Sequence, residues 1–494
     1  MEINKVISSL IAYALKNEFI PQEDEVYCTN RLLEIFKLEA YEPEDISNSI
    51  DEIMDSALAY AQAHKLRDFE NQNELDCFDA LIMDAIMPRP SQVIAKFHAL
   101  KSISPKEATD WYYDFSIKSR YIRTDRLAKN IVYAVKGEKN DLDIAINLSK
   151  PEKDPKEIAR LRTIKSSSYP KCLLCKENEG YYGTYSKPGR SNHRIIPIEI
   201  NNEKFFLQYS PYGYFNEHCI VLKSEHSPMS ISKSTFKRFV DFLDQFPHYM
   251  IGSNADLPIV GGSILSHEHF QGGNYEFPLT KTNSIYSFKI KGFDSCDCSI
   301  LNWPMSVIRI QTKNKNDLVE LSDKILTKWR NYSDVEGGII AYDEDKTPHN
   351  TITPISRMRK DKYEIDLVLR NNLTSNEYPD GIFHPHQELH HIKKENIGLI
   401  EVMGLAVLPG RLKDELHLCA RYLIGEDKNV DPLIEKHMDW LKQLSAKHTF
   451  TKDNVEEILR QEVGLVFERV LIDCGVYKLN ETGLDAFKKF IKTI

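Results

Sequence analysis

Two histidines and a glutamine alternate within one glycine-flanked stretch, residues 261–273, which reads Gly-Gly-Ser-Ile-Leu-Ser-His-Glu-His-Phe-Gln-Gly-Gly. In an extended segment, side chains two residues apart lie on the same face, so His267, His269 and Gln271 are expected to point the same way. An imidazole is a good nucleophile toward phosphorus, and a neighbouring amide can hold a phosphate oxygen. The stretch therefore predicts phosphoryl or nucleotidyl transfer through a covalent histidine intermediate. A bare His-x-His pair also arises by chance in glycine-rich loops.

The size and composition of the chain bound its class. With 494 residues the chain is too long to fold around one hydrophobic core of ordinary size, so roughly two to four domains are expected. A hydrophobic content of 41% and a charged content of 28% are typical of a soluble globular protein. The net charge of −9 argues against nucleic acid as a partner, because no overall basic field is available.

Three features of the sequence indicate a cytoplasmic protein without membrane contact. No apolar run approaches the roughly 20 residues that cross a bilayer. Residues 1–19 form a charged, amphipathic stripe rather than a signal peptide. The nine cysteines are odd in number and scattered, which fits reduced thiols better than a disulfide framework.

Four parts are expected along the chain. Residues 1–155 place apolar residues at helical spacing and hold no catalytic constellation, which predicts a helical N-terminal domain. Residues 156–280 and 281–425 each run as strands, a helix and further strands, which predicts an α+β fold with antiparallel sheets in two related halves. A buried strand is expected over 397–410, and helices are expected over 426–494.

Residues of the metal-ligand type occur in two places. Cys172 and Cys175 form a lone Cys-x-x-Cys pair, which fits a zinc knuckle, a redox pair or coincidence. Because no second such pair exists, histidines from elsewhere would have to complete a tetrahedral site. Five histidines lie within residues 349–391. They fit either a metal site or a solvated loop. They are His349, His384, His386, His390 and His391.

The segment Ser-His-Glu-His-Phe-Gln-Gly-Gly resembles the active-site motif of the galactose-1-phosphate uridylyltransferases, a branch of the histidine-triad superfamily. Hydrolase relatives carry a third histidine where the transferases carry a glutamine, here Gln271. The sequence of this motif and the chain length together resemble the second, bacterial class of these uridylyltransferases, and the resemblance covers most of residues 166–410. The resemblance implies two histidine-triad-like sheet units with covering helices.

The resemblance implies a ping-pong exchange of UMP between UDP-glucose and galactose 1-phosphate, with His269 as the nucleophile. Attack on the α-phosphorus would release glucose 1-phosphate and leave a uridylyl-histidine. The leaving sugar phosphate is already a low-pKa anion, so no general acid is needed. Gln271 would stabilise charge on the phosphoryl oxygens without titrating.

Further substrate contacts follow from the same resemblance. Asn254 and Ser263 would contact phosphate, and Asn192 and Arg194 would contribute to uridine recognition. The better-known class lines its sugar pocket with an aromatic and an acidic residue, which are replaced by leucine and alanine at positions 405–406. Sugar recognition must therefore be built differently in this chain.

The resemblance also implies bound metal. A structural zinc site with four protein ligands would leave no open position for water. In the better-known class an iron-bearing structural site uses comparable histidines, so a second metal is an open expectation near His349, His384 and His386. His218 is expected to be structural. The implied zinc ligands are Cys172, Cys175, His226 and His267.

Two other functions fit the motif. One is a related nucleotidyltransferase such as a dinucleotide-tetraphosphate phosphorylase, and the other is a non-catalytic zinc- or nucleotide-binding relative. Chain length and the Cys-x-x-Cys pair favour the uridylyltransferase, and the intact His269 and Gln271 count against a non-catalytic protein. The expected partners are UDP-glucose and galactose 1-phosphate, with no nucleic acid and no membrane, and a homodimer is left open.

Overall fold

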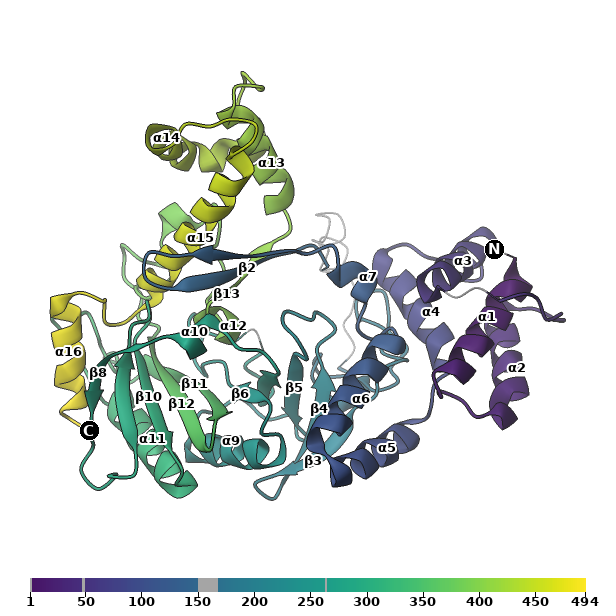
Figure 1. Cartoon of the computed structure of the whole chain (residues 1–494), viewed down its shortest axis with the longest axis horizontal. Helices are drawn as coiled ribbons and strands as arrows, with labels where there is room; N and C mark the ends of the chain where they lie inside the picture. The colour runs from purple at the N-terminus through teal and green to yellow at the C-terminus, as the bar shows by residue number, and fades with distance from the viewer. Residues whose placement is uncertain (1, 47–48, 150–167, 263) are drawn as a thin grey trace. The chain divides into compact units, whose positions relative to one another are not determined.

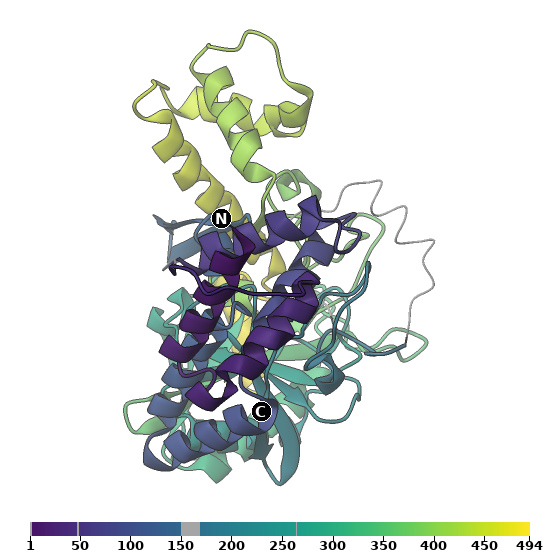
Figure 2. The same cartoon turned by 90° about the vertical axis from the view of Figure 1, so that its right-hand side faces the viewer.

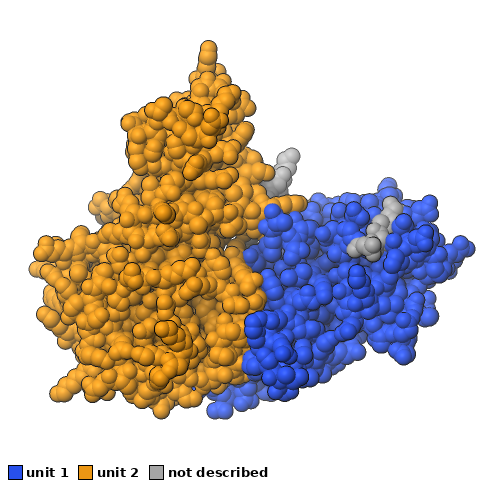
Figure 3. Space-filling model, viewed as in Figure 1, with its two compact units in different colours: residues 1–128, 153–213, 219–226 blue, residues 129–152, 214–218, 227–494 orange. Residues whose placement is uncertain are grey.

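The computed structural model describes residues 2–46, 49–149, 168–262 and 264–494, which divide into two compact units (Figure 3). Unit 1 comprises residues 1–128, 153–213 and 219–226, and unit 2 comprises residues 129–152, 214–218 and 227–494. The predicted boundary near residue 155 lies outside the described residues. The four-part division of the chain stays a prediction. In the described ranges, no helix combines the length and the apolar character needed to span a membrane.

Helices make up the first part of unit 1, and α1 packs on α2 and α3 (Figure 2). Helix α6 begins with a cap, because the Ser104 hydroxyl accepts from the Glu107 N–H and Pro105 occupies the first turn. The bounds are α1 Ile3–Lys16, α2 Glu25–Phe36, α3 Ile50–Ala63, α4 Gln72–Asp84, α5 Pro90–Ile103, α6 Pro105–Lys118 and α7 Thr124–Leu127.

The helical expectation is wrong beyond α7. Two antiparallel strands of unit 2, β1 (Ile131–Lys136) and β2 (Asp141–Asn147), follow instead. More buried and more exposed residues alternate along parts of both strands, and β-branched side chains are frequent in them. Both features favour a pleated, half-buried strand over a helix.

A three-stranded antiparallel meander completes unit 1, as the sequence predicts. It consists of β3 (Ile196–Ile200), β4 (Glu203–Tyr209) and β5 (Cys219–Lys223), with β4 hydrogen-bonded to both neighbours. The turn between β3 and β4 holds Asn201 and Asn202 at φ 53° and 59°. Asparagine tolerates this left-handed region, which the tight two-residue hairpin requires.

Unit 2 is built on one antiparallel sheet with the strand order β7-β6-β11-β12-β10-β9-β8. Helices α9 (Lys233–Gln245) and α11 (Lys315–Arg330) pack against each other and against this sheet (Figure 1). The strands are β6 Met250–Gly252, β7 His269–Gly273, β8 Ser284–Phe288, β9 Asp297–Leu301, β10 Val307–Thr312, β11 Asn350–Arg359 and β12 Lys362–Asn371.

The expected repeat is present in the order of the elements. Three strands β3-β4-β5 are followed by helix α9 and the antiparallel pair β6-β7. Three strands β8-β9-β10 are likewise followed by helix α11 and the antiparallel pair β11-β12. The predicted α+β class with antiparallel sheets is therefore confirmed.

The predicted strand over 397–410 is only partly correct. Its first part forms the short helix α12 (Leu399–Val402), and only β13 (Leu405–Pro409) is a strand, parallel to β2. Gly404 separates them at φ 99°, a conformation that favours glycine, and a Cβ there would lie 2.8 Å from Trp303. Residues 338–342, within the second predicted half, form only isolated bridges.

The C-terminal residues form helices, as expected. α15 packs on β1 and β2, and Gly464 allows that approach, because a Cβ there would lie 2.2 Å from Val135. The remaining helices of unit 2 are α10 Pro278–Lys281, α13 Leu412–Leu423, α14 Met438–Lys447, α15 Val455–Cys474 and α16 Glu481–Ile491.

Candidate active site

The strand β7 presents alternate side chains to opposite faces, as its sequence predicts. Glu268, directly before the strand, pairs with Arg238 of α9 at 2.6 Å, and Phe270 meets Phe239 of α9 edge-on at a ring distance of 5.2 Å. These contacts fix one face of the strand against the helix. The two histidines and the glutamine of the motif alternate with these residues and therefore belong to the other face.

His269 is a buried, neutral imidazole. Its side chain is 6% exposed, and its Nδ1 lies 2.7 Å from the carbonyl oxygen of His267. Since a carbonyl can only accept, Nδ1 carries the proton and Nε2 keeps its lone pair. Burial lowers the pKa of His269 to about 4, so the ring is uncharged at pH 7. The residue therefore has the protonation state that a nucleophile needs.

The Gln271 side chain contacts His218, a residue that was expected to be structural. Its Oε1 lies 2.9 Å from Nε2 of His218, and that histidine is only 3% exposed. The two residues are 53 positions apart. No local spacing rule connects residues at that separation, so no pattern in the sequence could have paired them.

The predicted phosphate contacts lie between β6 and β7. Asn254 follows β6 and is buried, and its Oδ1 accepts a hydrogen bond of 2.9 Å from the backbone N–H of Leu399. That bond orients the carboxamide, whose Nδ2 then faces away from Leu399. Ser263 lies outside the described residues.

Asn192 and Arg194 both lie buried in unit 1. The Asn192 amide donates to the carbonyl of Ser119 at 2.9 Å. The Arg194 guanidinium donates to Asp84 at 2.7 Å and to the carbonyl of Pro88 at 3.0 Å. These bonds hold the segment against the N-terminal helices. The predicted role of both residues in uridine recognition stays a prediction.

Three of the four predicted zinc ligands cluster within unit 1. The Sγ atoms of Cys172 and Cys175 lie 3.6 Å apart, and Sγ of Cys175 lies 3.2 Å from Nδ1 of His226. In a tetrahedral site, zinc–ligand bonds of 2.0–2.3 Å place neighbouring ligand atoms about 3.5–3.8 Å apart. The donor set fits zinc, and so does the 3.6 Å distance between the two Sγ atoms, whereas the 3.2 Å distance from Cys175 to His226 is shorter than a tetrahedral site gives. The fourth predicted ligand, His267, is a buried residue of unit 2, directly before β7.

Burial raises the pKa of the Cys172 thiol to about 11. A bound zinc ion reverses that effect, because a coordinating thiol is deprotonated by the metal. The charge of the thiolates would thus depend on the ion.

The histidines of residues 349–391 do not gather into one site. His349 bonds to Asn372 at 2.8 Å and His384 to Asn396 at 3.0 Å. Over the described part of the chain, His386 alone of the three predicted residues belongs to a group that could hold a metal, with Glu388 and Asp473.

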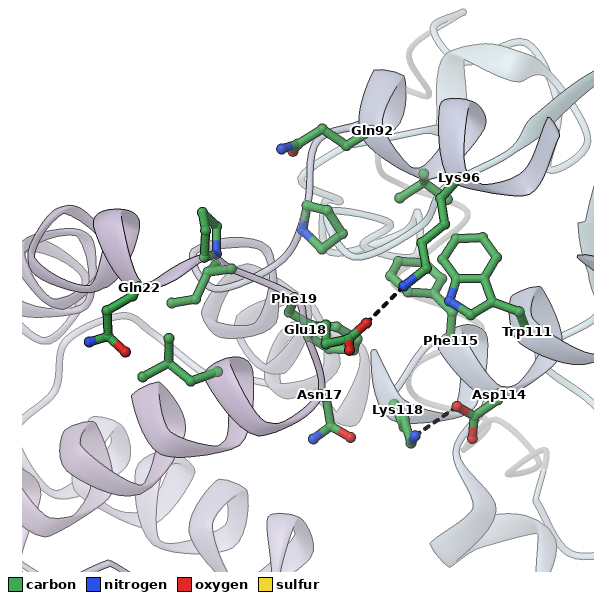
Figure 4. A pocket seen from close by; sticks show the side chains of 15 residues that line it. Asn17, Glu18, Phe19, Gln22, Gln92, Lys96, Trp111, Asp114, Phe115 and Lys118 are labelled. Atoms are coloured by element: carbon green, nitrogen blue, oxygen red, sulfur yellow. Dashed lines mark hydrogen bonds and ion pairs between the residues drawn. The ribbon is translucent and has the colours of Figure 1, made fainter. Parts of the chain in front are cut away.

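A separate hollow of about 550 Å³ lies among the N-terminal helices of unit 1 (Figure 4). Lys96 and Lys118 line it, and each is paired with a carboxylate, Glu18 at 3.0 Å and Asp114 at 2.7 Å. Its two cations are already neutralised, and it contains none of the predicted site residues. We therefore assign it no part in the chemistry.

Comparisons with known proteins place this geometry in a family. Residues 18–228 match the model of the galactose-1-phosphate uridyl transferase N-terminal domain, and residues 242–442 match that of the C-terminal domain. A galactose-1-phosphate uridylyltransferase of Clostridium acetobutylicum is 52% identical over 498 residues, covering 100% of both chains. One of Bacillus subtilis is 46% identical over 501 residues, covering 99% of this chain and 98% of the relative.

The solved structure of yeast Ap4A phosphorylase Apa2 aligns with a TM-score of 0.35 and 10% identity, over 72% of this chain and 92% of that one.

A buried, neutral histidine beside an amide on an antiparallel strand suits a nucleotidyl-transferring enzyme, and the matched relatives are transferases. The chain belongs to the galactose-1-phosphate uridyl transferase family.

Proposed function

We propose that the protein exchanges UMP between UDP-glucose and galactose 1-phosphate by a ping-pong mechanism through uridylyl-His269. The observation that carries the proposal is the fixed tautomer of His269, whose Nδ1–H is donated to the His267 carbonyl at 2.7 Å. Only Nε2 can then attack. The names of the relatives supply the class of substrate.

The first half-reaction forms one bond and breaks one. The Nε2 lone pair of His269 bonds to the α-phosphorus of UDP-glucose, and the bond from that phosphorus to the bridging oxygen breaks. Glucose 1-phosphate leaves with the electron pair and needs no proton. The imidazole becomes cationic, and the His267 carbonyl that accepts from Nδ1 stabilises this charge. Gln271 donates to the phosphoryl oxygens in the transition state.

The second half-reaction is the reverse process with a different sugar phosphate. A phosphate oxygen of galactose 1-phosphate attacks the uridylyl phosphorus, and the electrons of the N–P bond return to Nε2 of His269. UDP-galactose leaves, and the neutral imidazole is restored. The proton on Nδ1 stays in place throughout, so the cycle needs no general acid or base.

Isotope exchange tests the ping-pong order. Labelled glucose 1-phosphate should enter UDP-glucose in the absence of galactose 1-phosphate, because the first half-reaction runs alone. Initial rates should give parallel double-reciprocal lines. If exchange required galactose 1-phosphate, both sugars would have to bind before transfer, and the covalent intermediate would be ruled out. Offering a dinucleotide tetraphosphate and inorganic phosphate in the same assay tests the phosphorylase alternative.

Replacing Asn254 with aspartate should weaken substrate binding without unfolding the protein. The new carboxylate can still accept from the Leu399 N–H, as the amide oxygen does at 2.9 Å. It removes the N–H donors and places a negative charge beside the phosphates. We expect KM for UDP-glucose to rise at least about tenfold, the equivalent of one lost charge-assisted hydrogen bond. Unchanged KM with unchanged Tm would remove Asn254 from the site.

We propose that zinc is held by Cys172, Cys175 and His226, with His267 as the fourth ligand. Four protein ligands make the ion structural, so it takes no part in the reaction. Since His267 also lends its carbonyl to His269, the ion would stabilise the backbone that fixes the tautomer. Ser263 as a phosphate contact, and Asn192 and Arg194 in uridine recognition, belong to the same proposal.

Replacing Cys172 with alanine should lower the zinc content and the melting temperature. Removal of one ligand from a structural zinc site destabilises the fold it closes. We expect the zinc bound per chain to fall well below one and Tm to fall by several degrees. Loss of activity with full zinc content and wild-type Tm would contradict the structural assignment.

A homodimer and a cytoplasmic location stay expectations from the sequence. Light scattering of the purified protein tests the first directly.

A further inference from the structure

We infer that His218 is a positioning residue for the transfer reaction, which acts by holding the Gln271 amide with its nitrogen toward the reacting phosphate. The inference rests on the proposed function, because it assigns the hydrogen bond between His218 and Gln271 a role in the proposed transfer reaction. Its basis is the 2.9 Å contact between Nε2 of His218 and Oε1 of Gln271.

The tautomer of His218 follows from its other nitrogen. Nδ1 is buried and has no hydrogen-bond partner among the residues that the structure describes. A buried N–H without an acceptor is costlier than a buried lone pair without a donor, so the proton belongs on Nε2. Burial lowers the pKa of His218 to about 4, so the ring carries this one proton at pH 7.

That proton decides which way the Gln271 amide faces. Nε2–H can only donate, so the atom of Gln271 opposite it must be the carbonyl oxygen. The planar amide then turns its NH₂ group, with two donors, away from His218. A glutamine that could flip would present its oxygen to the phosphate for part of the time, and an amide oxygen repels a phosphoryl oxygen. His218 therefore turns Gln271 into a fixed donor.

The chain holds His218 in place by several contacts within unit 2. Gly273 at φ 149° lets the segment 214–218 approach the end of β7, since a Cβ there would lie 2.6 Å from the Glu217 carbonyl oxygen. The Glu217 carboxylate accepts from the Tyr249 hydroxyl at 2.5 Å and from the Asn274 amide at 3.2 Å. The neighbouring backbone of His218 is thereby fixed from two sides.

Aromatic packing fixes the ring itself. Phe215 lies against the imidazole at a ring distance of 4.5 Å, and Tyr214 lies at 5.7 Å. A phenylalanine at position 218 keeps this packing but has no N–H. A glutamine there keeps an N–H donor near the place of Nε2. These two variants separate the hydrogen bond from the volume of the side chain.

The test compares His218→Phe and His218→Gln in wild-type and Gln271→Ala backgrounds. We expect His218→Phe to lower kcat about 10- to 100-fold, the effect of a misplaced catalytic group, with a smaller change in KM. His218→Gln should recover most of that loss. In the Gln271→Ala background, His218→Phe should cost no further activity, because the group it positions is absent.

A second measurement, which does not depend on activity, accompanies the comparison of these variants. The side-chain NH₂ signals of Gln271, assigned by their absence from Gln271→Ala, should shift and broaden in His218→Phe and remain sharp in His218→Gln. His193→Phe supplies a stability control, since it breaks a similar buried bond of 2.8 Å to Gln208 in unit 1. Its Tm gives the stability cost of such a bond outside the motif.

Three results would overturn the inference. They are a wild-type kcat in His218→Phe, equal losses in both backgrounds, and unchanged Gln271 NH₂ signals. Failure of the proposed function looks different, since wild-type protein would then form no uridylyl adduct. In that case the NH₂ signals still decide whether His218 orients Gln271.

Discussion

Replacing His269 with alanine is expected to abolish turnover while the protein stays folded. The motif holds two imidazoles, and because that of His267 is the proposed zinc ligand, the His269 ring is the one proposed to bond to phosphorus. Its Nε2 lone pair has no substitute on β7. Removal of a covalent nucleophile costs at least about 10⁴-fold in rate. The structural cost is modest, because the side chain makes one described hydrogen bond, to the His267 carbonyl, worth about 1–3 kcal/mol once unpaired.

The measurement is kcat together with Tm and zinc content. Phe270→Leu is the matched control, because Phe270 lies on the opposite face of the same strand and packs on Phe239 of α9. It should lower Tm by removing aromatic contact and should retain turnover. If His269→Ala kept more than about one per cent of wild-type kcat, transfer would not depend on this imidazole, and the mechanism would be wrong.

Gln271→Ala is expected to have the second largest effect. Loss of one preorganised donor to a phosphoryl or oxyanion group costs about 10²- to 10³-fold in kcat. KM should change less, because the interaction strengthens only as charge develops in the transition state. The change also leaves the buried N–H of His218 without its partner at 2.9 Å, so Tm should fall as well.

Single-turnover kinetics with UDP-glucose separate the two half-reactions in this variant. Both rate constants should fall, because the same phosphoryl oxygens are stabilised when His269 attacks and when it leaves. A variant that forms the adduct at the wild-type rate would show that Gln271 does not act on the transition state. Gln271→Glu is a useful comparison, since it keeps an oxygen for His218 but replaces the donors with a negative charge.

The arrangement of the side chains on β7 could be predicted because it is local. A period of two fixes which side chains share a face, and the contacts of Glu268 and Phe270 with α9 confirm the opposite face. The Cys172 and Cys175 pair is likewise a local signal, and their Sγ atoms lie 3.6 Å apart. The proposed zinc role of His226 rests only on the family resemblance, since nothing in its own segment marks it as a ligand.

The partner of Gln271 could not be predicted, because it depends on tertiary structure. His218 is 53 residues away, and its position depends on Gly273 and Glu217. The partly wrong prediction of a strand over residues 397–410 has a local cause. The apolar run 397–410 fits a buried strand or a helix equally well, and Gly404, at φ 99°, separates the helix from the strand.

Intact-mass analysis after incubation with UDP-glucose alone tests the central claim most directly. The proposed mechanism predicts the added mass of one uridylyl group per chain, located on His269 by peptide mapping and removed by galactose 1-phosphate with formation of UDP-galactose. Turnover by a protein that never carries this adduct, or an adduct on another residue, would contradict it.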